Sequence, residues 1–257
     1  MDRLFIRENH EKAKEPRQIN IGVTGLGRSV GTTLAASSLA LYLAEAGYSV
    51  TFTQCGDPEK TNGLLFVAAA IDKRFYGREF TDFYGEIAAG RTIRNRRNME
   101  MGVNWRLMTP TDVDRKVRLD EAQKTRLMAG TGDDVCVFDI EPGSGYEEFL
   151  VDMDVIVAVV DPLPSRMTAD TEAFRKLLAM EGSGNFKFIW LVSGVNSGVS
   201  KRQVRNFIRS NEISWVDRVP DEVIYRNEYR CRFQWEDETV KTIFSDVFTK
   251  VSHYIGN

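Results

Sequence analysis

The stretch that decides the fold is GLGRSVGTTLAASSLALYLAEAG, residues 25–47. The apolar segment Ile19–Thr24 precedes it and is typical of a buried strand. The alanine- and leucine-rich run from Thr33 to about Glu45 predicts a helix that is closed by Gly47. A strand, a glycine-rich turn and a helix in this order present backbone N–H groups and a helix N-terminus to an anion. The sequence therefore indicates a phosphate-binding loop.

Apolar strands alternate with helical patterns along the rest of the chain. The patterns predict strands at 48–53, 134–140, 155–160 and 186–192, and helices at 80–89, 116–128, 168–180, 201–208 and 239–254. Continuous apolar strands that alternate with helices are typical of a parallel sheet covered on both faces. We expect a three-layer α/β fold in which residues 18–257 form one domain after a polar tail at residues 1–17.

The composition excludes several classes of protein. The chain has 257 residues, 42% of them hydrophobic, and a net charge of −3, which favours a globular domain over a disordered one. Its three cysteines have no C-x-x-C spacing and its two histidines lie near opposite ends, so no zinc or iron–sulfur site is expected. The cysteines are interpreted as small buried hydrophobes in a cytoplasmic protein. No run of 18 apolar residues predicts a membrane span.

Other kinds of active or binding surface are also disfavoured. No G-x-S-x-G nucleophile motif occurs, and the adjacent pairs Glu147-Glu148 and Asp133-Asp134 are interpreted as surface charges. The last helix has an apolar stripe that could lie on a membrane surface. Its polar face carries Glu238 and Asp246 as well as lysines, which favours packing in the core.

Four segments in order resemble the ParA/MinD superfamily of deviant Walker ATPases. Residues 25–58, which end in Cys-Gly-Asp-Pro, are similar to the family pattern K-G-G-x-G-K-T-T followed by D-x-D-P. CVFDIEPG at 136–143 resembles the Walker B segment, and Asp161-Pro162 and Val219-Pro220-Asp221 are similar to later blocks. The resemblance implies a P-loop NTPase-like fold with a mostly parallel sheet, ATP or ADP with Mg²⁺ as cofactor, and a homodimer.

The resemblance also assigns roles to residues. Thr33 and Asp139 match the magnesium-holding positions, and Asp57 matches the residue that positions the attacking water. Asn196 lies near the base-reading position of the family, although a turn asparagine in Asn-Ser-Gly is an equal alternative. The nucleotide-binding residues implied are Gly27, Arg28, Ser29, Val30, Gly31, Thr32, Thr33, Asn196 and Pro220.

Two departures from the family pattern remove positive charge from the loop. The two P-loop lysines of the family fall on Gly27 and Thr32. Phosphoryl transfer depends on cations placed at the developing charge, so we expect little or no ATP hydrolysis. Backbone N–H groups and Mg²⁺ still favour a bound polyphosphate, and Arg28 could supply one charge. A relic loop that only packs, with a solvated Arg28, is the alternative.

The variant Val30-Gly31-Thr32-Thr33-Leu34-Ala35 is similar to the TadZ/CpaE branch of the superfamily, whose members localise the Tad/Flp pilus machinery to a cell pole. This implies a scaffold or localisation factor with partners in a pilus or secretion machine. One alternative is a slow Mg²⁺-dependent ATPase that partitions DNA or positions cargo through an ATP-dependent dimer. Another is an adaptor that needs no nucleotide.

Two basic groups suggest contact with DNA or a protein partner. Four arginines fall within seven residues, and a second group recurs at helical spacing. Phosphate neutralisation by such residues dominates non-specific DNA affinity, whereas solvated surface charge is the bland alternative. The residues concerned are Arg91, Arg94, Arg96, Arg97, Lys201, Arg202, Arg205 and Arg209.

Overall fold

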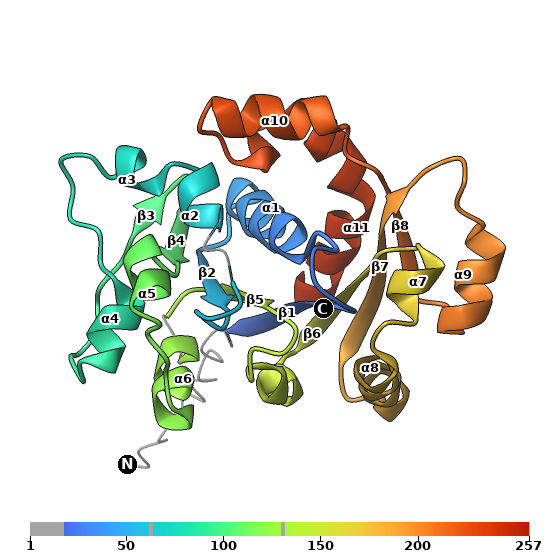
Figure 1. Cartoon of the computed structure of the whole chain (residues 1–257), viewed down its shortest axis with the longest axis horizontal. Helices are drawn as coiled ribbons and strands as arrows, with labels where there is room; N and C mark the ends of the chain where they lie inside the picture. Colours follow the sequence, from blue (N-terminus) through green and yellow to red (C-terminus); the bar gives the residue numbers. More distant parts are fainter. Residues whose placement is uncertain (1–17, 62–63, 130–131, 257) are drawn as a thin grey trace, which may run out of the picture.

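The computed structural model describes residues 18–61, 64–129 and 132–256, so the predicted tail at 1–17 lies outside the described residues. An eight-stranded sheet in the order β3-β4-β2-β5-β1-β6-β7-β8 runs through the molecule (Figure 1). All neighbouring strands pair in parallel except β3 and β4, which are antiparallel. The strands are β1 (Ile19–Gly25), β2 (Val50–Cys55), β3 (Met99–Glu100), β4 (Val103–Arg106), β5 (Val135–Ile140), β6 (Val155–Val160), β7 (Lys187–Val195) and β8 (Ile213–Asp217).

Helices cover both faces of this sheet, which confirms the predicted three-layer α/β architecture (Figure 1). One face packs against α1 (Thr32–Glu45), α2 (Leu64–Ala68), α3 (Ile71–Arg74), α10 (Asp221–Tyr229) and α11 (Glu238–Gly256). The other packs against α4 (Phe83–Ala88), α5 (Pro110–Asp114), α6 (Glu121–Met128), α7 (Pro164–Met167), α8 (Thr171–Ser183) and α9 (Lys201–Ile208). Short 3₁₀ helices at Glu147–Asp152 and Gln234–Glu236 complete the elements.

The central strands are apolar throughout because each is buried on both faces. On β5, Val135 and Val137 contribute to the core beneath α1, whereas Cys136 and Phe138 contribute to the core beneath α4 and α6. Side chains alternate between the two sides of a strand, so only a continuous apolar run can fill both cores. Helix α1 therefore packs directly on one face of the sheet.

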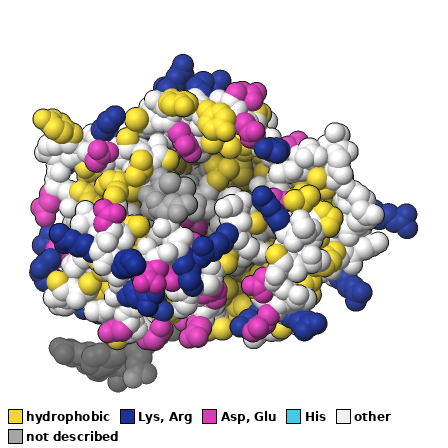
Figure 2. Space-filling model, in the orientation of Figure 1, with side chains coloured by type: hydrophobic (Ala, Val, Ile, Leu, Met, Phe, Trp, Pro, Cys, Tyr) yellow, Lys and Arg dark blue, Asp and Glu magenta, His cyan; other side chains and the backbone are white. Residues whose placement is uncertain are grey.

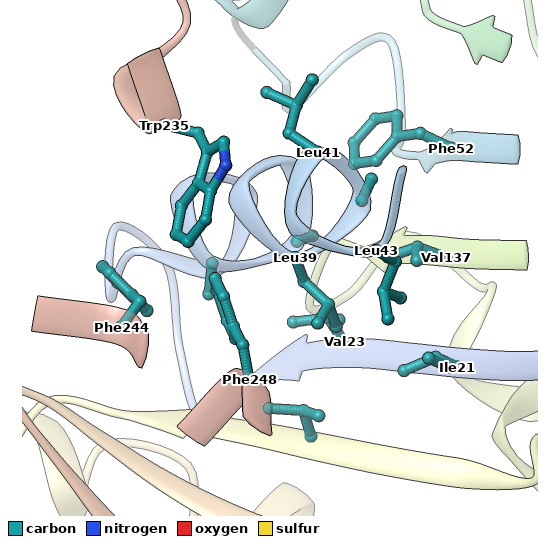
Figure 3. Close-up of a cluster of buried hydrophobic side chains, with 14 of the residues drawn as sticks. Ile21, Val23, Leu39, Leu41, Leu43, Phe52, Val137, Trp235, Phe244 and Phe248 are labelled. Atoms are coloured by element: carbon teal, nitrogen blue, oxygen red, sulfur yellow. The ribbon is translucent and has the colours of Figure 1, made fainter. Parts of the chain in front are cut away.

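Helix α11 packs beside α1 through aromatic side chains. Phe248 lies with its ring centroid 5.6 Å from that of Tyr42, 5.4 Å from that of Trp235 and 5.1 Å from that of Phe244. Figure 3 shows Trp235 and Phe248 against α1 at its left, Phe52 from β2 at its right and Val23 from β1 beneath it. The apolar stripe of the last helix is therefore core, as the sequence predicts. None of the helices in the described ranges is both long and apolar enough to cross a membrane.

Several predicted boundaries are wrong because capping side chains start helices later than the apolar pattern does. Asp82 caps α4 by accepting from the Gly85 N–H, so the helix begins at Phe83 instead of residue 80. Asp120 forms a capping box with Gln123, which breaks the helix predicted at 116–128 and starts α6 at Glu121. Asp170 likewise delays α8 to Thr171.

Elements that the sequence patterns missed lie mainly at the margins of the sheet. They are the strands β3, β4 and the half-buried β8, and the helices α2, α3, α5, α7 and α10. The predicted exposure of Asp133 is also wrong, since this side chain is 4% exposed and pairs with Arg97 at 2.9 Å. Cys55 and Cys136 are buried as predicted, and Cys231 is half-buried.

The aromatic packing between α1 and α11 predicts a large loss of stability when one of its buried rings is removed. Phe248→Ala should lower the free energy of unfolding by about 3–5 kcal/mol, because it removes a side chain that is 1% exposed and leaves a cavity. Tyr229→Ala on α10 is the matched control: that ring is 89% exposed, and its loss should change stability by less than about 0.5 kcal/mol. Urea unfolding followed by circular dichroism measures both values, and equal losses would contradict this account of the core.

Candidate functional site

A cavity of about 350 Å³ lies where β1, β2 and β5 end and α1 begins. Open parallel sheets place binding crevices at the carboxyl ends of their strands. Backbone and side chains from the glycine-rich loop, the segment after β2 and the end of β5 line it: Gly27, Arg28, Ser29, Gly31, Thr32, Thr33, Leu34, Gln54, Gly56, Lys60, Thr61, Leu65, Asp139, Glu141 and Pro142.

The loop before α1 folds back tightly upon itself. A Cβ atom at Gly25 would lie 2.5 Å from the Thr32 hydroxyl oxygen and 2.8 Å from the Gly27 carbonyl oxygen, so only glycine fits there. Gly31 has a φ of 93°, in the left-handed region that glycine adopts without strain. The Leu26 N–H donates to the Val159 carbonyl at 2.9 Å, and buried Leu26 fixes the loop to the core.

This conformation leaves hydrogen-bond donors at the cavity. Within the described residues, no acceptor receives a hydrogen bond from the backbone N–H groups of Arg28, Ser29, Gly31 or Thr32. Helix α1 has neither a capping side chain at Gly31 nor an acidic residue in its first turn. Unpaired N–H groups at a helix N-terminus favour a bound anion, and phosphate groups match this geometry.

Thr33 and Asp139 meet at the inner end of the cavity. The Thr33 hydroxyl donates to the Asp139 carboxylate at 2.8 Å. Burial raises the pKa of Asp139 to about 7, the Thr33 hydrogen bond opposes this shift, and the charge of Glu141 adds to it. A carboxylate beside a hydroxyl is an oxygen donor set that suits Mg²⁺. No group of three or more histidine, cysteine, aspartate or glutamate side chains in the described residues could hold a metal, so phosphate or water oxygens would have to complete the shell.

Two cations reach this cavity from positions other than those of the missing lysines. Lys60, in the segment after β2, donates to the Gly143 carbonyl at 2.6 Å and lies 3.4 Å from the Asp57 carboxylate. Arg28 is exposed on the loop, and its charge counteracts the burial that raises the pKa of Glu141. Positive charge therefore remains at the cavity although Gly27 and Thr32 supply none.

Sequence reasoning missed both Lys60 and Glu141. Glu141 follows Asp139 by two residues, and its Oε2 atom is buried without a hydrogen-bond partner in the described part of the chain. Lys60 follows Asp57 by three residues. Each lies two or three residues after an aspartate that matches the family pattern. This proximity is the signal that could have identified them.

The other predicted site residues are placed less uniformly. Asp57 lines an adjoining hollow, and although partial burial raises its pKa, the Glu59 N–H and Lys60 outweigh this and lower it. Val30 is buried in the core. Asn196 lines a separate hollow with Arg218 and accepts a hydrogen bond from the Gly198 N–H, as a turn residue does. Pro220 precedes α10 and does not line the loop cavity.

The predicted basic groups do not form one surface. The arginines at 91–97 lie beside α4, whereas α9 lies at the opposite end of the sheet (Figure 1). Arg91, Arg96 and Arg97 pair with Glu86, Glu79 and Asp133. Figure 2 shows lysine and arginine side chains interspersed with acidic ones.

The basic face predicted for α9 is also incomplete. Lys201 lies over the Trp215 ring at 5.4 Å, and the helix ends at Ile208. Arg209 then adopts a left-handed conformation with a φ of 57°, so the predicted continuation of the face from Arg205 to Arg209 is wrong.

Comparison with solved structures finds the same fold in ATPases of bacteria and archaea. The MinC:MinD cell division complex of Aquifex aeolicus matches with a TM-score of 0.71 and 14% identity over 91% of this chain and 96% of that chain. MinD of Pyrococcus horikoshii complexed with Mg-ADP gives 0.66 and 14% over 91% and 95%. A putative plasmid partition protein of Borrelia burgdorferi bound to AMPPNP gives 0.64 and 14% over 90% and 99%.

No family model matches the sequence, and no curated protein matches it either. TM-scores of 0.64 to 0.71 over 90–91% of this chain establish the shared architecture in spite of the 14% identity, so the chain has the P-loop NTPase-like fold of MinD and ParA proteins.

The buried carboxylate predicts a pH dependence of stability. Because the folded-state pKa of Asp139 is about 7, above its ordinary value, the native protein binds more protons than the unfolded chain between about pH 4 and pH 7. Stability from this group is therefore lost as the pH rises. Without Mg²⁺, Asp139→Asn should become progressively more stable relative to the unsubstituted protein up to about pH 7 and then level off, as measured by urea unfolding.

Asp134→Asn is the control for that series. Hydrogen bonds from Ser49 lower the pKa of Asp134, so its substitution should give no relative gain with rising pH. A pH-independent difference for Asp139→Asn would contradict the assigned burial of the charge.

Proposed function

We propose that this chain binds a Mg²⁺–nucleotide at the glycine-rich loop, hydrolyses it little or not at all, and acts as a localisation or scaffold factor. The observation that carries the proposal is the union, in one cavity, of unpaired loop N–H groups and the Thr33–Asp139 pair. The N–H groups would receive phosphate oxygens, and Thr33 and Asp139 would hold the metal ion. Mg²⁺ would supply charge neutralisation on the phosphates.

The charges at the cavity favour binding over turnover. Arg28 and Lys60 supply two cations, and Asp139 and Glu141 supply two carboxylates, so the cavity attracts a polyphosphate mainly through its N–H groups and metal. Gly27 and Thr32 place no cation on the transferring phosphoryl group. Loss of such a cation typically costs about 10³- to 10⁵-fold in rate. Slow or absent hydrolysis follows.

Nucleotides in the structural neighbours support the cofactor assignment. The Borrelia burgdorferi protein is bound to AMPPNP and the Pyrococcus horikoshii protein to Mg-ADP. Residues 30–35 resemble the TadZ/CpaE branch. On this resemblance we propose that the chain forms a homodimer in the cytoplasm. The dimer would localise a pilus or secretion machine to one place in the cell, such as a pole. Protein partners would bind the surface of such a scaffold, and the bound nucleotide would stabilise its folded state.

Restoring a lysine tests whether the loop is a working site. Thr32→Lys should tighten ATP binding by at least about tenfold, because a charge-assisted hydrogen bond to phosphate is worth on the order of 1.5–3 kcal/mol. Isothermal titration calorimetry with Mg-ATP measures the change. A loop that only packs would not respond.

The controls separate a local effect from net charge. Thr242→Lys adds the same charge at an exposed position of α11, outside the cavity, and should leave affinity unchanged. Ser29→Asp places a carboxylate on the loop at a φ of 57°, which aspartate tolerates, and should abolish binding. Binding that survives Ser29→Asp unchanged would overturn the proposed site.

A second candidate is a slow Mg²⁺-dependent ATPase that partitions DNA or positions cargo through an ATP-dependent dimer. Lys60 favours it, since a flexible lysine at the cavity edge could move onto the phosphates when nucleotide binds. Asp57, paired with Lys60, would then be freed to orient water.

Hydrolysis and self-association together test this candidate. Phosphate release that is lost in Lys60→Gln but retained in Lys176→Gln, an exposed lysine on α8, would support it. Sedimentation with and without Mg-ATP should show dimers only with nucleotide. Absence of turnover in the unsubstituted protein, with dimers formed in both conditions, favours the scaffold.

A further inference from the structure

A further hollow, of about 530 Å³, is lined by five arginines and lies away from the glycine-rich loop. We call it the arginine basin: Arg94, Arg96, Arg97, Arg106, Arg126 and Asn104. It lies on the face of the sheet that packs against α4 and α6, beside β4, which contributes Asn104 and Arg106. Asp133, which pairs with Arg97 of the basin, precedes β5, and Asp139 lies six residues further on, about 20 Å along an extended chain.

The positive charge of the basin is only partly compensated. Asp133 pairs with Arg97 at 2.9 Å, and Glu79, itself 78% exposed, pairs with Arg96 at 2.8 Å. In the part of the chain that the structure describes, no carboxylate pairs with Arg94, Arg106 or Arg126. The basin therefore presents more cations than anions.

Backbone carbonyls orient two of these arginines without neutralising them. Arg106 donates through Nη1 to the carbonyls of Leu127 and Ala129, the latter at 3.3 Å. Arg126 donates through Nη2 to the Arg91 carbonyl at 2.8 Å. A carbonyl fixes the direction of a guanidinium but leaves its unit charge in place.

Arg106 is the least expected member of the group. Its side chain is 5% exposed, it lies over the Phe83 ring at 5.1 Å, and its Nε has no hydrogen-bond partner in the described ranges. Desolvation by burial lowers the pKa of Arg106, and the charge of Asp133, which is already paired with Arg97, opposes this shift only in part. A buried guanidinium without its own carboxylate costs folding free energy unless an anion comes to it.

Buried polar side chains hold the floor of the basin rigid. Asn104 donates to the Thr51 hydroxyl at 3.1 Å, and that hydroxyl donates to Asp133. Asn98 donates its backbone N–H to the Asn104 side-chain oxygen at 2.9 Å. Satisfied networks of this kind fix the geometry of the groups that they support.

We propose that the arginine basin binds a compact anion that carries two or more phosphate groups, at a site separate from the glycine-rich loop. Guanidinium forks match pairs of phosphate oxygens, and the volume of the basin lies within the range of small-molecule pockets. The cations converge on a hollow, which suits a compact ligand better than the extended backbone of duplex DNA. A compact polyphosphate and a DNA backbone present the same phosphate groups to arginine. The experiment therefore includes a probe of each kind.

Inorganic tripolyphosphate is the probe, titrated by calorimetry into the full chain carrying Ser29→Asp, which closes the loop site to phosphate. One tripolyphosphate should bind per chain in this background. Arg94→Gln with Arg96→Gln should weaken that binding by at least about tenfold, since each removes a charge-assisted contact. Arg126→Lys, which keeps the charge and loses the fork, should weaken it less.

Arg202→Gln with Arg205→Gln on α9 is the matched control and should leave affinity unchanged, with thermal unfolding confirming that every variant is folded. Equal weakening by the control, or no binding of tripolyphosphate at millimolar concentration, would overturn the proposal. So would preferential binding of a 20-base-pair duplex that is lost in the basin variant, because it would assign the arginines to a DNA backbone.

Discussion

The hydrogen bond from Thr33 to Asp139 ties the start of α1 to the end of β5, and the arrangement of the site depends on it. Asp139 is buried at the centre of the sheet, where an unpaired carboxylate would be costly. Thr33 can satisfy it only if α1 begins directly beneath the strand, and that requires the turn through Gly25 and Gly31. The same turn leaves the loop N–H groups unpaired. Packing of α1 on the sheet and against its neighbour α11 then holds the assembly in place.

Much of this could be predicted because the central strands carry an unmistakable apolar signal. Strands β1, β5 and β6 must fill two cores, so their boundaries were predicted to within a residue or so. Helices α4, α6 and α8 began later than predicted because a single aspartate in each case sets the first residue. The hydrophobic periodicity of a sequence indicates which residues are buried. It does not indicate which side chain caps a helix, because a cap is a hydrogen bond.

The site was harder to predict for a related reason. The loop and the Thr33–Asp139 pair follow from local sequence, since the strand, turn and helix that position them are contiguous or strongly apolar. Lys60 lines the cavity because of the conformation of the segment that follows β2. No spacing of residues in the sequence predicts that conformation. Asp133 was misjudged because adjacent carboxylates suggest a surface, whereas Thr51 from a neighbouring strand buries it. Contacts between distant segments determine both outcomes.

The short antiparallel strand β3 has a further consequence for how copies of this chain could meet. An exposed strand edge is a template on which another chain can add a strand. Here β3 has only two residues. Arg78 donates a hydrogen bond to the Met99 carbonyl, and both Arg74 and Arg78 form ion pairs with Glu100. That edge is closed to sheet extension by its own neighbours. Self-association through a continuous sheet is thereby discouraged at the β3 edge, and a contact between chains there would be made by side chains and loops.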